Sequence, residues 1–164
     1  MPATYELISS TNVTTTQASV TFSSIPATYT DLRLVFSGFG SGNFGVRVNG
    51  DTGANYNYTY FAGGGGTVDS GYANGATYMP ITAYGMGLSA TIQQFYTVDF
   101  FSYADSTYKT ALSTSSEDQN TGGGYVVRQA NLWRNTTAIN SVTAFGSTNL
   151  QSGSVVSLYG ILRA

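Results

Sequence analysis

Residues 18–36 carry the clearest alternation of apolar and polar positions in the chain. In the first part, Val20 and Phe22 alternate with serine and threonine, the two-residue period of a strand with one buried and one wet face. Pro26 ends this run, because proline fixes its own φ and has no N–H for a sheet ladder. A second alternating run follows, and its inward positions are Leu32, Leu34 and Phe36. The segment predicts a hairpin or a corner that buries five large side chains and carries no chemistry.

Short runs of the same kind continue through the chain, with turn signals between nearly all of them. The further predicted strands are 4–9, 44–49, 56–61, 77–84, 91–103, 107–115, 125–134, 139–145 and 154–162. Asn49 and Gly50 are a turn signal, because both residue types tolerate a positive φ. Pro80 predicts that 77–84 lies at a sheet edge, and a run that is apolar on both faces, 91–103, predicts a central strand or a subunit interface.

The glycine-rich segment 63–75 has no clear period. Within it, we expect residues 63–66 to form a mobile loop or a loop pressed against a neighbouring subunit. No window of the chain shows the apolar spacing of a helix. The sequence therefore predicts an all-β protein, a single domain over residues 1–164. Its fold would be a two-sheet antiparallel sandwich of jelly-roll or Greek-key type.

Composition narrows the functions that this scaffold can carry. Only 9% of the 164 residues are charged and the net charge is −2, so there is no basic footprint for nucleic acid. The chain has no cysteine and no histidine, which excludes disulfides, thiolate chemistry and the commonest general base. A surface of uncharged polar residues favours a protein that works packed against neighbours or outside cells.

Residues 1–20 lack a basic segment and an apolar run of the kind found in secretory signals. No segment approaches the roughly 18–20 apolar residues that span a bilayer. We therefore expect synthesis in a cytoplasm and no membrane partner.

Each candidate for chemistry has a plainer structural interpretation. Asp99 lies inside an apolar strand, where a carboxylate is most often paired with an arginine. The acid pair Glu117 and Asp118 is expected in a polar turn, and the glycines of 63–66 are not followed by the lysine of a phosphate-binding loop. Asp51 or Asp69 could contribute to a calcium site, but the required spacing of acids is absent. The sequence predicts no catalytic, metal-binding or cofactor-binding residue, and no cofactor.

Aromatic residues are the remaining candidates for a site. Tyr56, Tyr58 and Tyr60 share one face of a predicted strand, and Tyr72, Tyr78, Tyr84 and Trp133 could join them. Ordinary cross-strand packing is the favoured interpretation. A protein interface comes second and stacking against a sugar third. As interface residues the sequence nominates Tyr56, Tyr58, Tyr60, Tyr72, Tyr78 and Trp133.

The two ends of the chain resemble a known family. The segments TYELISST (4–11), SVTFSSIPATYTDLRLVF (19–36) and SGSVVSLYGIL (152–162) are similar to a recurrent domain of tailed-phage virion proteins, common in phages of cyanobacteria and other aquatic bacteria. The resemblance implies a β-sandwich in which both ends frame a variable middle. The family includes head decoration (cement) proteins, head fibres and parts of tail fibres. No catalytic residues carry over.

The resemblance implies a non-enzymatic structural protein of the virion, made in the host cytoplasm. The favoured role is a capsid decoration protein that binds the major capsid protein or other virion proteins and stabilises the assembled head, as a homo-oligomer with a trimer favoured. The alternative is a tail or head fibre, or a receptor-binding module that recognises a host surface glycan. We also expect 18–36 and 154–162 to pack together.

Overall fold

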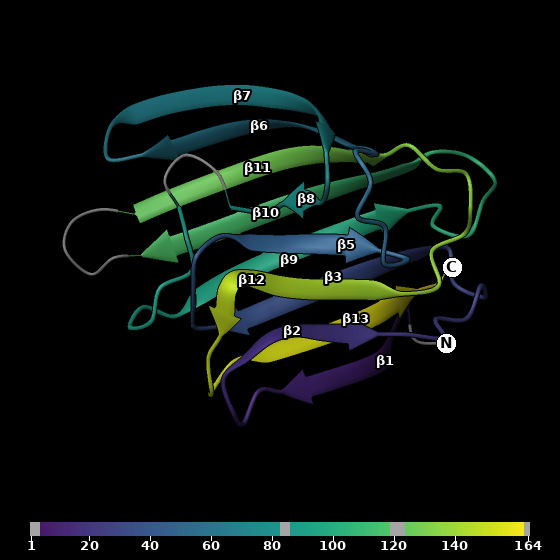
Figure 1. Ribbon diagram of the computed structural model, residues 1–164, viewed down its shortest axis with the longest axis horizontal. Coiled ribbons are helices and arrows are strands. Elements are labelled where there is room, and N and C mark those ends of the chain that lie inside the picture. Colours follow the sequence, from purple (N-terminus) through teal and green to yellow (C-terminus); the bar gives the residue numbers. More distant parts are fainter. Residues whose placement is uncertain (1–3, 83–85, 119–123, 163–164) are drawn as a thin grey trace.

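A computed structural model describes residues 4–82, 86–118 and 124–162. In these residues the protein is a β-sandwich of two antiparallel sheets and contains no helix (Figure 1). The larger sheet has eight strands, in the order β1 (Tyr5–Asn12), β13 (Val155–Ile161), β3 (Asp31–Gly38), β9 (Gln94–Phe101), β10 (Lys109–Asp118), β11 (Gly124–Trp133), β6 (Tyr56–Gly64) and β7 (Thr67–Ala76). The smaller sheet contains, in order, β2 (Gln17–Phe22), β12 (Val142–Leu150), β5 (Phe44–Val48) and β8 (Met79–Pro80), with β4 (Gly40–Ser41) also paired to β12.

The chain passes between the two sheets at most of its connections, so both sheets are built from distant parts of the sequence. The connectivity could not be predicted from the sequence, but the all-β class and the two-sheet sandwich are confirmed. Only β6–β7 and β9–β10–β11 are runs of consecutive strands that pair with each other.

The 18–36 segment folds as a corner rather than a hairpin. Its first strand, β2, belongs to the smaller sheet and its second, β3, to the larger one. Val20, Phe22, Leu32, Leu34 and Phe36 are all buried, as the alternation predicts. The backbone turns at Ser24, with φ of 56°, and Ile25 then donates its N–H to the carbonyl of Asn140. The corner therefore fastens the two sheets at one end.

The predicted contact between the two ends of the chain is confirmed. Strand β13 pairs with β3 along its whole length, with Leu158 opposite Leu34, and its other side pairs with β1. Three of the strands that carry the family resemblance, β1, β13 and β3, are therefore neighbours in the larger sheet, and the fourth, β2, belongs to the smaller one.

The core between the sheets is centred on three aromatic rings. Phe36 of β3 and Tyr96 of β9 come from the larger sheet, and Phe44 of β5 comes from the smaller one. The ring centroids lie 4.7 Å apart for Phe36–Phe44, 5.4 Å for Phe36–Tyr96 and 5.2 Å for Phe44–Tyr96. All three side chains are fully or almost fully buried, so this cluster contributes much of the apolar area that holds the sheets together.

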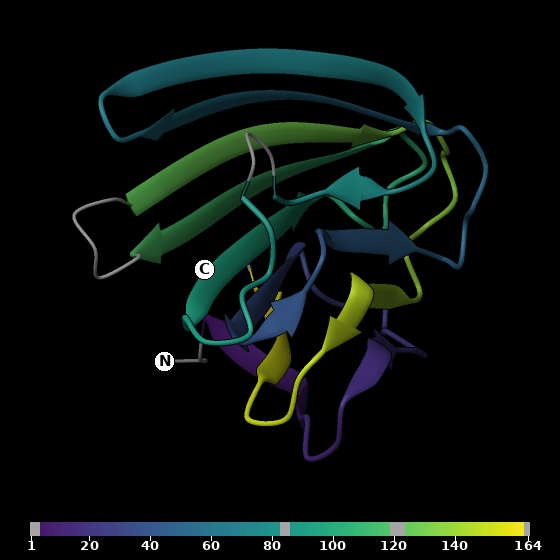
Figure 2. The same cartoon turned by 60° about the vertical axis from the view of Figure 1, so that its left-hand side comes forward.

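The expected loop at 63–66 is the end of β6 and a tight turn, and the following residues, for which no element was predicted, form strand β7. Gly65 and Gly66 form the turn with φ of 58° and 86°, and the strands pair from Gly64 opposite Thr67 back to Tyr56 opposite Ala76. Strand β7 was missed because it lies beyond the smaller sheet and therefore needs no alternating apolar face (Figure 2). Glycine-rich strands of this kind are held by backbone hydrogen bonds and give no periodic signal.

The 107–115 and 125–134 runs form β10 and β11, as expected, but β10 extends further than the pattern suggested. Glu117 belongs to this strand, opposite Tyr125, and accepts a hydrogen bond from Gln94, so its assignment to a turn was wrong. Residues 119–123, the rest of the expected turn, lie outside the described residues. Edge strand β8 contains Pro80 and β9 is central, as predicted.

Replacing Leu34 with alanine tests the core assignment. Leu34 is 1% exposed and lies where β3 meets β13, so we expect the free energy of unfolding to fall by about 2–5 kcal/mol in urea denaturation. As a control, Leu7→Ala removes the same atoms from a side chain that is 57% exposed and should cost less than about 0.5 kcal/mol. Equal losses in the two variants would contradict the assignment.

Candidate functional site

The candidate site is the face of the eight-stranded sheet that points away from the smaller sheet, called here the outer face. Successive side chains of a strand point to opposite sides, so each buried residue of the sheet alternates with one on this face. Strand register aligns the outer residues in rows across the sheet. One such row is Val68, Gly63, Val126, Ser116, Phe95, Ser37, Val155 and Asn12.

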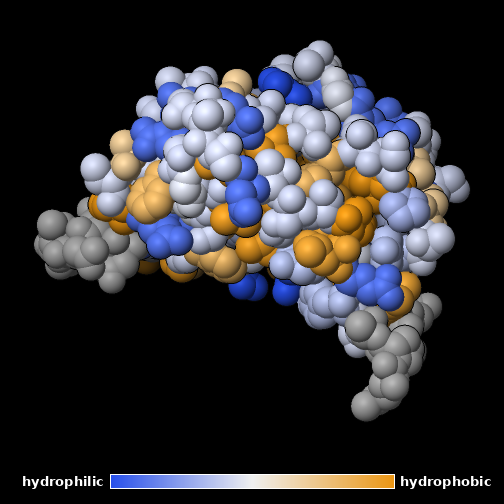
Figure 3. All heavy atoms as spheres, turned by 90° about the horizontal axis from the view of Figure 1, so that it is seen from below, coloured by the Kyte–Doolittle hydropathy of each residue, from blue (hydrophilic) through white to orange (hydrophobic). Residues whose placement is uncertain are grey.

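Apolar side chains are concentrated on the outer face. Of the nine large hydrophobic residues that are strongly exposed in the described part of the chain, eight lie here, from 42% exposed for Phe101 to 76% for Tyr72. The eight are Tyr5, Leu7, Phe61, Val68, Tyr72, Phe95, Phe101 and Val126. Figure 3 looks onto the edge formed by β1 and β2, and apolar residues appear along its lower outline, on the side of the larger sheet, with hydrophilic ones between them. Exposed apolar surface on this scale is typical of a protein contact site.

Charge on the outer face is sparse and largely paired. Arg33 of β3 donates to both carboxylate oxygens of Asp99 on β9, at 2.5 and 2.8 Å, and its guanidinium lies 5.5 Å from the centroid of the Tyr5 ring. The hydrogen bond to Asp99 raises the pKa of Arg33 although burial opposes it. The expectation that Asp99 pairs with an arginine is confirmed, and no unpaired acid remains at this position.

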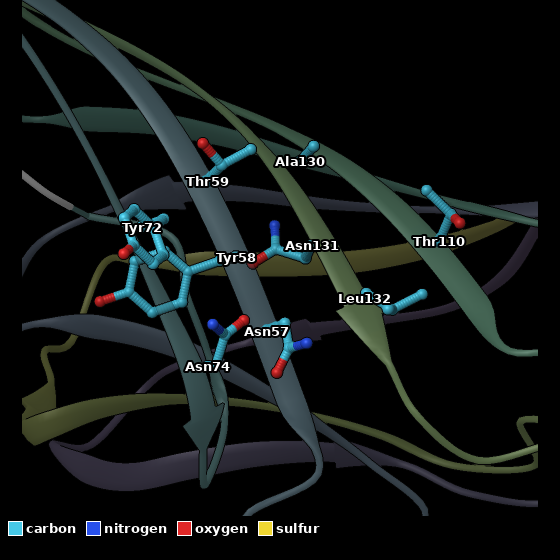
Figure 4. Close-up of a pocket in the computed structure, with 9 residues that line it drawn as sticks. All are labelled: Asn57, Tyr58, Thr59, Tyr72, Asn74, Thr110, Ala130, Asn131 and Leu132. Carbon is cyan, nitrogen blue, oxygen red and sulfur yellow. The ribbon is translucent and has the colours of Figure 1, made fainter.

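A groove of about 320 Å³ crosses the outer face near β7 (Figure 4). Apolar Ala130 and Leu132 contribute to its floor, and Tyr72, Asn57 and Asn74 stand at its β6–β7 side. The Asn57 amide oxygen accepts the N–H of Gly75, so the side chain is held in place. The remaining lining residues are Tyr58, Thr59, Thr110 and Asn131.

Two of the predicted interface residues, Tyr56 and Trp133, belong to the core. Both are at most 1% exposed, so neither has surface with which to contact a partner. The Tyr56 hydroxyl donates to the carbonyls of Val48 and Asp51, and burial raises its pKa to about 12. The indole of Trp133 donates to the Asp51 carboxylate at 2.7 Å. Their role is the packing that the sequence analysis favoured.

The other aromatic candidates do not form one cluster. Tyr60 is half-buried on the inner face of β6, and its hydroxyl donates to Asp69 at 2.7 Å. Tyr78 packs edge-on against Phe145 of β12, with the ring centroids 5.3 Å apart, so it lies beside the smaller sheet and not on the outer face. Tyr58 and Tyr72 both line the groove, and Tyr84 lies outside the described residues.

Asp51, a candidate calcium ligand, is a hydrogen-bond acceptor for the protein itself. Its carboxylate accepts from Trp133, from the Asn55 amide at 2.9 Å and from the Gly53 N–H at 2.8 Å. Burial tends to raise the pKa of this carboxyl, but the three hydrogen bonds together hold the pKa below its usual value. In the part of the chain that the structure describes, no three acidic, histidine or cysteine residues gather to hold a metal.

Sequence reasoning found part of the outer face and missed the rest. The double-sided apolar pattern of 91–103 pointed to Phe95 and Phe101, which lie on this face. Phe61, Val68 and Val126 were missed, since isolated apolar residues among serines and glycines give no periodic signal. The register of β11 and β6 is the information that would have placed these residues on the outer face, and only the structure provides it.

Comparisons with family models, with curated proteins and with solved structures found no match to this chain. A helix with the length and apolarity needed to cross a membrane is absent from the described ranges.

An Asp51→Asn variant tests the structural role of this carboxylate. Its pKa is lowered in the folded protein, so its stabilising effect is present above the unfolded pKa, near 4, and is lost as the pH falls through the folded value. We expect the variant to unfold with about 1–2 kcal/mol less free energy at pH 7 and the difference to shrink below about pH 4. Denaturant titrations at several pH values measure this, and a difference that is constant with pH would contradict it.

Proposed function

We propose that this protein is a non-enzymatic structural component of a tailed-phage virion that decorates and stabilises the assembled head. The observation that supports this proposal is the outer face, a broad sheet surface whose exposed side chains are mostly apolar or uncharged and polar, with few charges such as Arg33, Asp99 and Arg128. The resemblance of 4–11, 19–36 and 152–162 to virion proteins adds to it, because these segments supply three neighbouring strands of the sheet that carries this face.

Docking on a capsid explains why the face combines these residue types. Phe95, Phe101 and Phe61 would supply aromatic anchors, and the threonines and serines between them would pair with backbone and side-chain groups of the shell. Each contact is weak, but repetition of the subunit over a symmetric shell multiplies them. The partner is then the major capsid protein or a neighbouring virion protein.

The proposal predicts a high copy number and a specific docking face. Quantitative mass spectrometry of purified particles should find the protein in amounts comparable with the shell protein, and a few copies per particle would refute the decoration role. Phe95→Asp should weaken binding to undecorated heads at least about tenfold, because a charge would be buried among apolar contacts. Tyr108→Asp is the matched control, since Tyr108 is 57% exposed but lies outside the sheet, and it should bind normally.

The groove favours a second candidate function, recognition of a host surface glycan by a fibre or receptor-binding module. An exposed tyrosine ring suits the apolar face of a sugar, and the amides of Asn57 and Asn74 suit its hydroxyls. In that case Tyr72→Ala should reduce adsorption of the purified protein to host cells about tenfold without changing its melting temperature. Tyr108→Ala should leave adsorption unchanged, and equal adsorption by all three proteins would count against the glycan site.

A further inference from the structure

The two sheets have four edge strands, and three of them have features that discourage pairing with another chain. Strand β1 is interrupted by a bulge between Leu7 and Ser9. Strand β8 has only two residues, one of them Pro80, and β2 pairs continuously with β12 over only four residues, Phe22 to Ser19. Bulges, prolines and short strands are the usual means by which sheet edges avoid pairing.

Strand β7 is neither short nor interrupted by proline, and its one irregularity lies near its end. It is ten residues long, contains no proline and no lysine, and has a register shift only near its end, where Tyr56 and Tyr58 meet it. Figures 1 and 2 both show β7 as the outermost strand, projecting past the smaller sheet with no element over its free side. A neighbouring chain could approach this edge without contacting the rest of the sandwich.

The turn determines which backbone groups of β7 are free. Gly65 and Gly66 form a two-residue turn with positive φ at both positions, so the closing pair, Gly64 and Thr67, exchanges hydrogen bonds. Hydrogen-bonded positions then alternate along β7, and the N–H and C=O groups of Val68, Ser70 and Tyr72 point away from β6. The side chains of these three residues are exposed on the outer face.

We propose that β7 pairs antiparallel with β7 of a second copy of this chain, with Ser70 opposite Ser70 across a two-fold axis. In this register Val68, 70% exposed, lies opposite Tyr72 of the second copy, and the reverse pair forms as well. Aromatic and β-branched residues are favourable cross-strand neighbours, so the apolar side chains of the edge cover each other.

Charge also favours a second copy as the occupant. The one acid of β7, Asp69, lies on the opposite side of the strand, where it accepts the Tyr60 hydroxyl, and in this register it meets Gly71 rather than another acid. An antiparallel strand pair is self-complementary, because each free donor meets the equivalent free acceptor of its copy. A foreign strand would need to match the same spacing of valine and tyrosine.

The pairing does not depend on the proposed virion role, but it has a consequence for it. The two-fold axis of an antiparallel pair is perpendicular to the sheet, so the eight-stranded sheets of the two copies join into one continuous sheet. Their outer faces then lie on the same side. A dimer of this kind would present two docking faces to one shell.

Sedimentation equilibrium of the purified protein should show a dimer, and Ser70→Pro should be monomeric. Proline removes the free N–H of Ser70 but no bond to β6, so the circular dichroism spectrum should be unchanged. Ser70→Thr keeps the N–H and should remain dimeric. A wild-type protein that is monomeric or trimeric, or a folded proline variant that is still dimeric, would overturn the inference. The trimeric result would instead agree with the oligomer expected from the family resemblance.

A second measurement does not require the proline variant to fold. The chain has no cysteine, so a disulfide can form only at an introduced site. Ser70→Cys should give a covalent dimer under mild oxidation at a far higher rate than Ser19→Cys, which places the thiol at another exposed serine, on edge strand β2. Equal rates for the two variants would contradict the pairing of β7 with a second copy. This result is also the one expected if β7 binds only a foreign strand.

Discussion

The five-stranded sheet covers only part of the inner face of the eight-stranded one, and the chain must cover the remainder by other means. The segment around β8 covers β10 and β11. Strand β8 has only two residues paired with β5, so this segment extends the smaller sheet very little. Side chains of the larger sheet therefore bind its backbone directly: Ser115 donates to the carbonyl of Ile81, at 2.6 Å, and Gln129 to that of Pro80. The buried polar residues in this part of the core are explained by this need, since a buried carbonyl must have a donor.

The same mismatch in area explains why part of the fold could be predicted from the sequence and part could not. Where both sheets are present, as at β3, β5 and β9, each strand needs one apolar face, and the alternation of Leu32, Leu34 and Phe36 is visible in the sequence. Where the smaller sheet ends, that requirement is lost. Strand β7 is therefore invisible to periodicity, although it pairs with β6 over most of its length.

The candidate site was predictable to a smaller degree, for a related reason. Tyr56, Tyr58 and Tyr60 were grouped because they share one face of a strand, but that face is the inner one, and the core takes Tyr56. A sequence shows which residues lie on the same face and not which face is covered. Phe61 of β6 and Val126 of β11 belong to the outer face, and the register in which these two strands pair is what brings them close together. That register follows from the whole topology.

The position of β13 between β1 and β3 has a consequence for how the chain is made. Strand β1 pairs only with β13, so it cannot join the larger sheet until residues 155–161 have been made and have paired with β3. During synthesis β1 therefore remains unpaired while almost all other strands emerge from the ribosome. Folding that depends on such distant pairings is slow, because a long loop must close before its contacts form. Completion of the sandwich is thus a late event, and chains released before residue 155 would leave β1 unpaired and β3 as an open sheet edge.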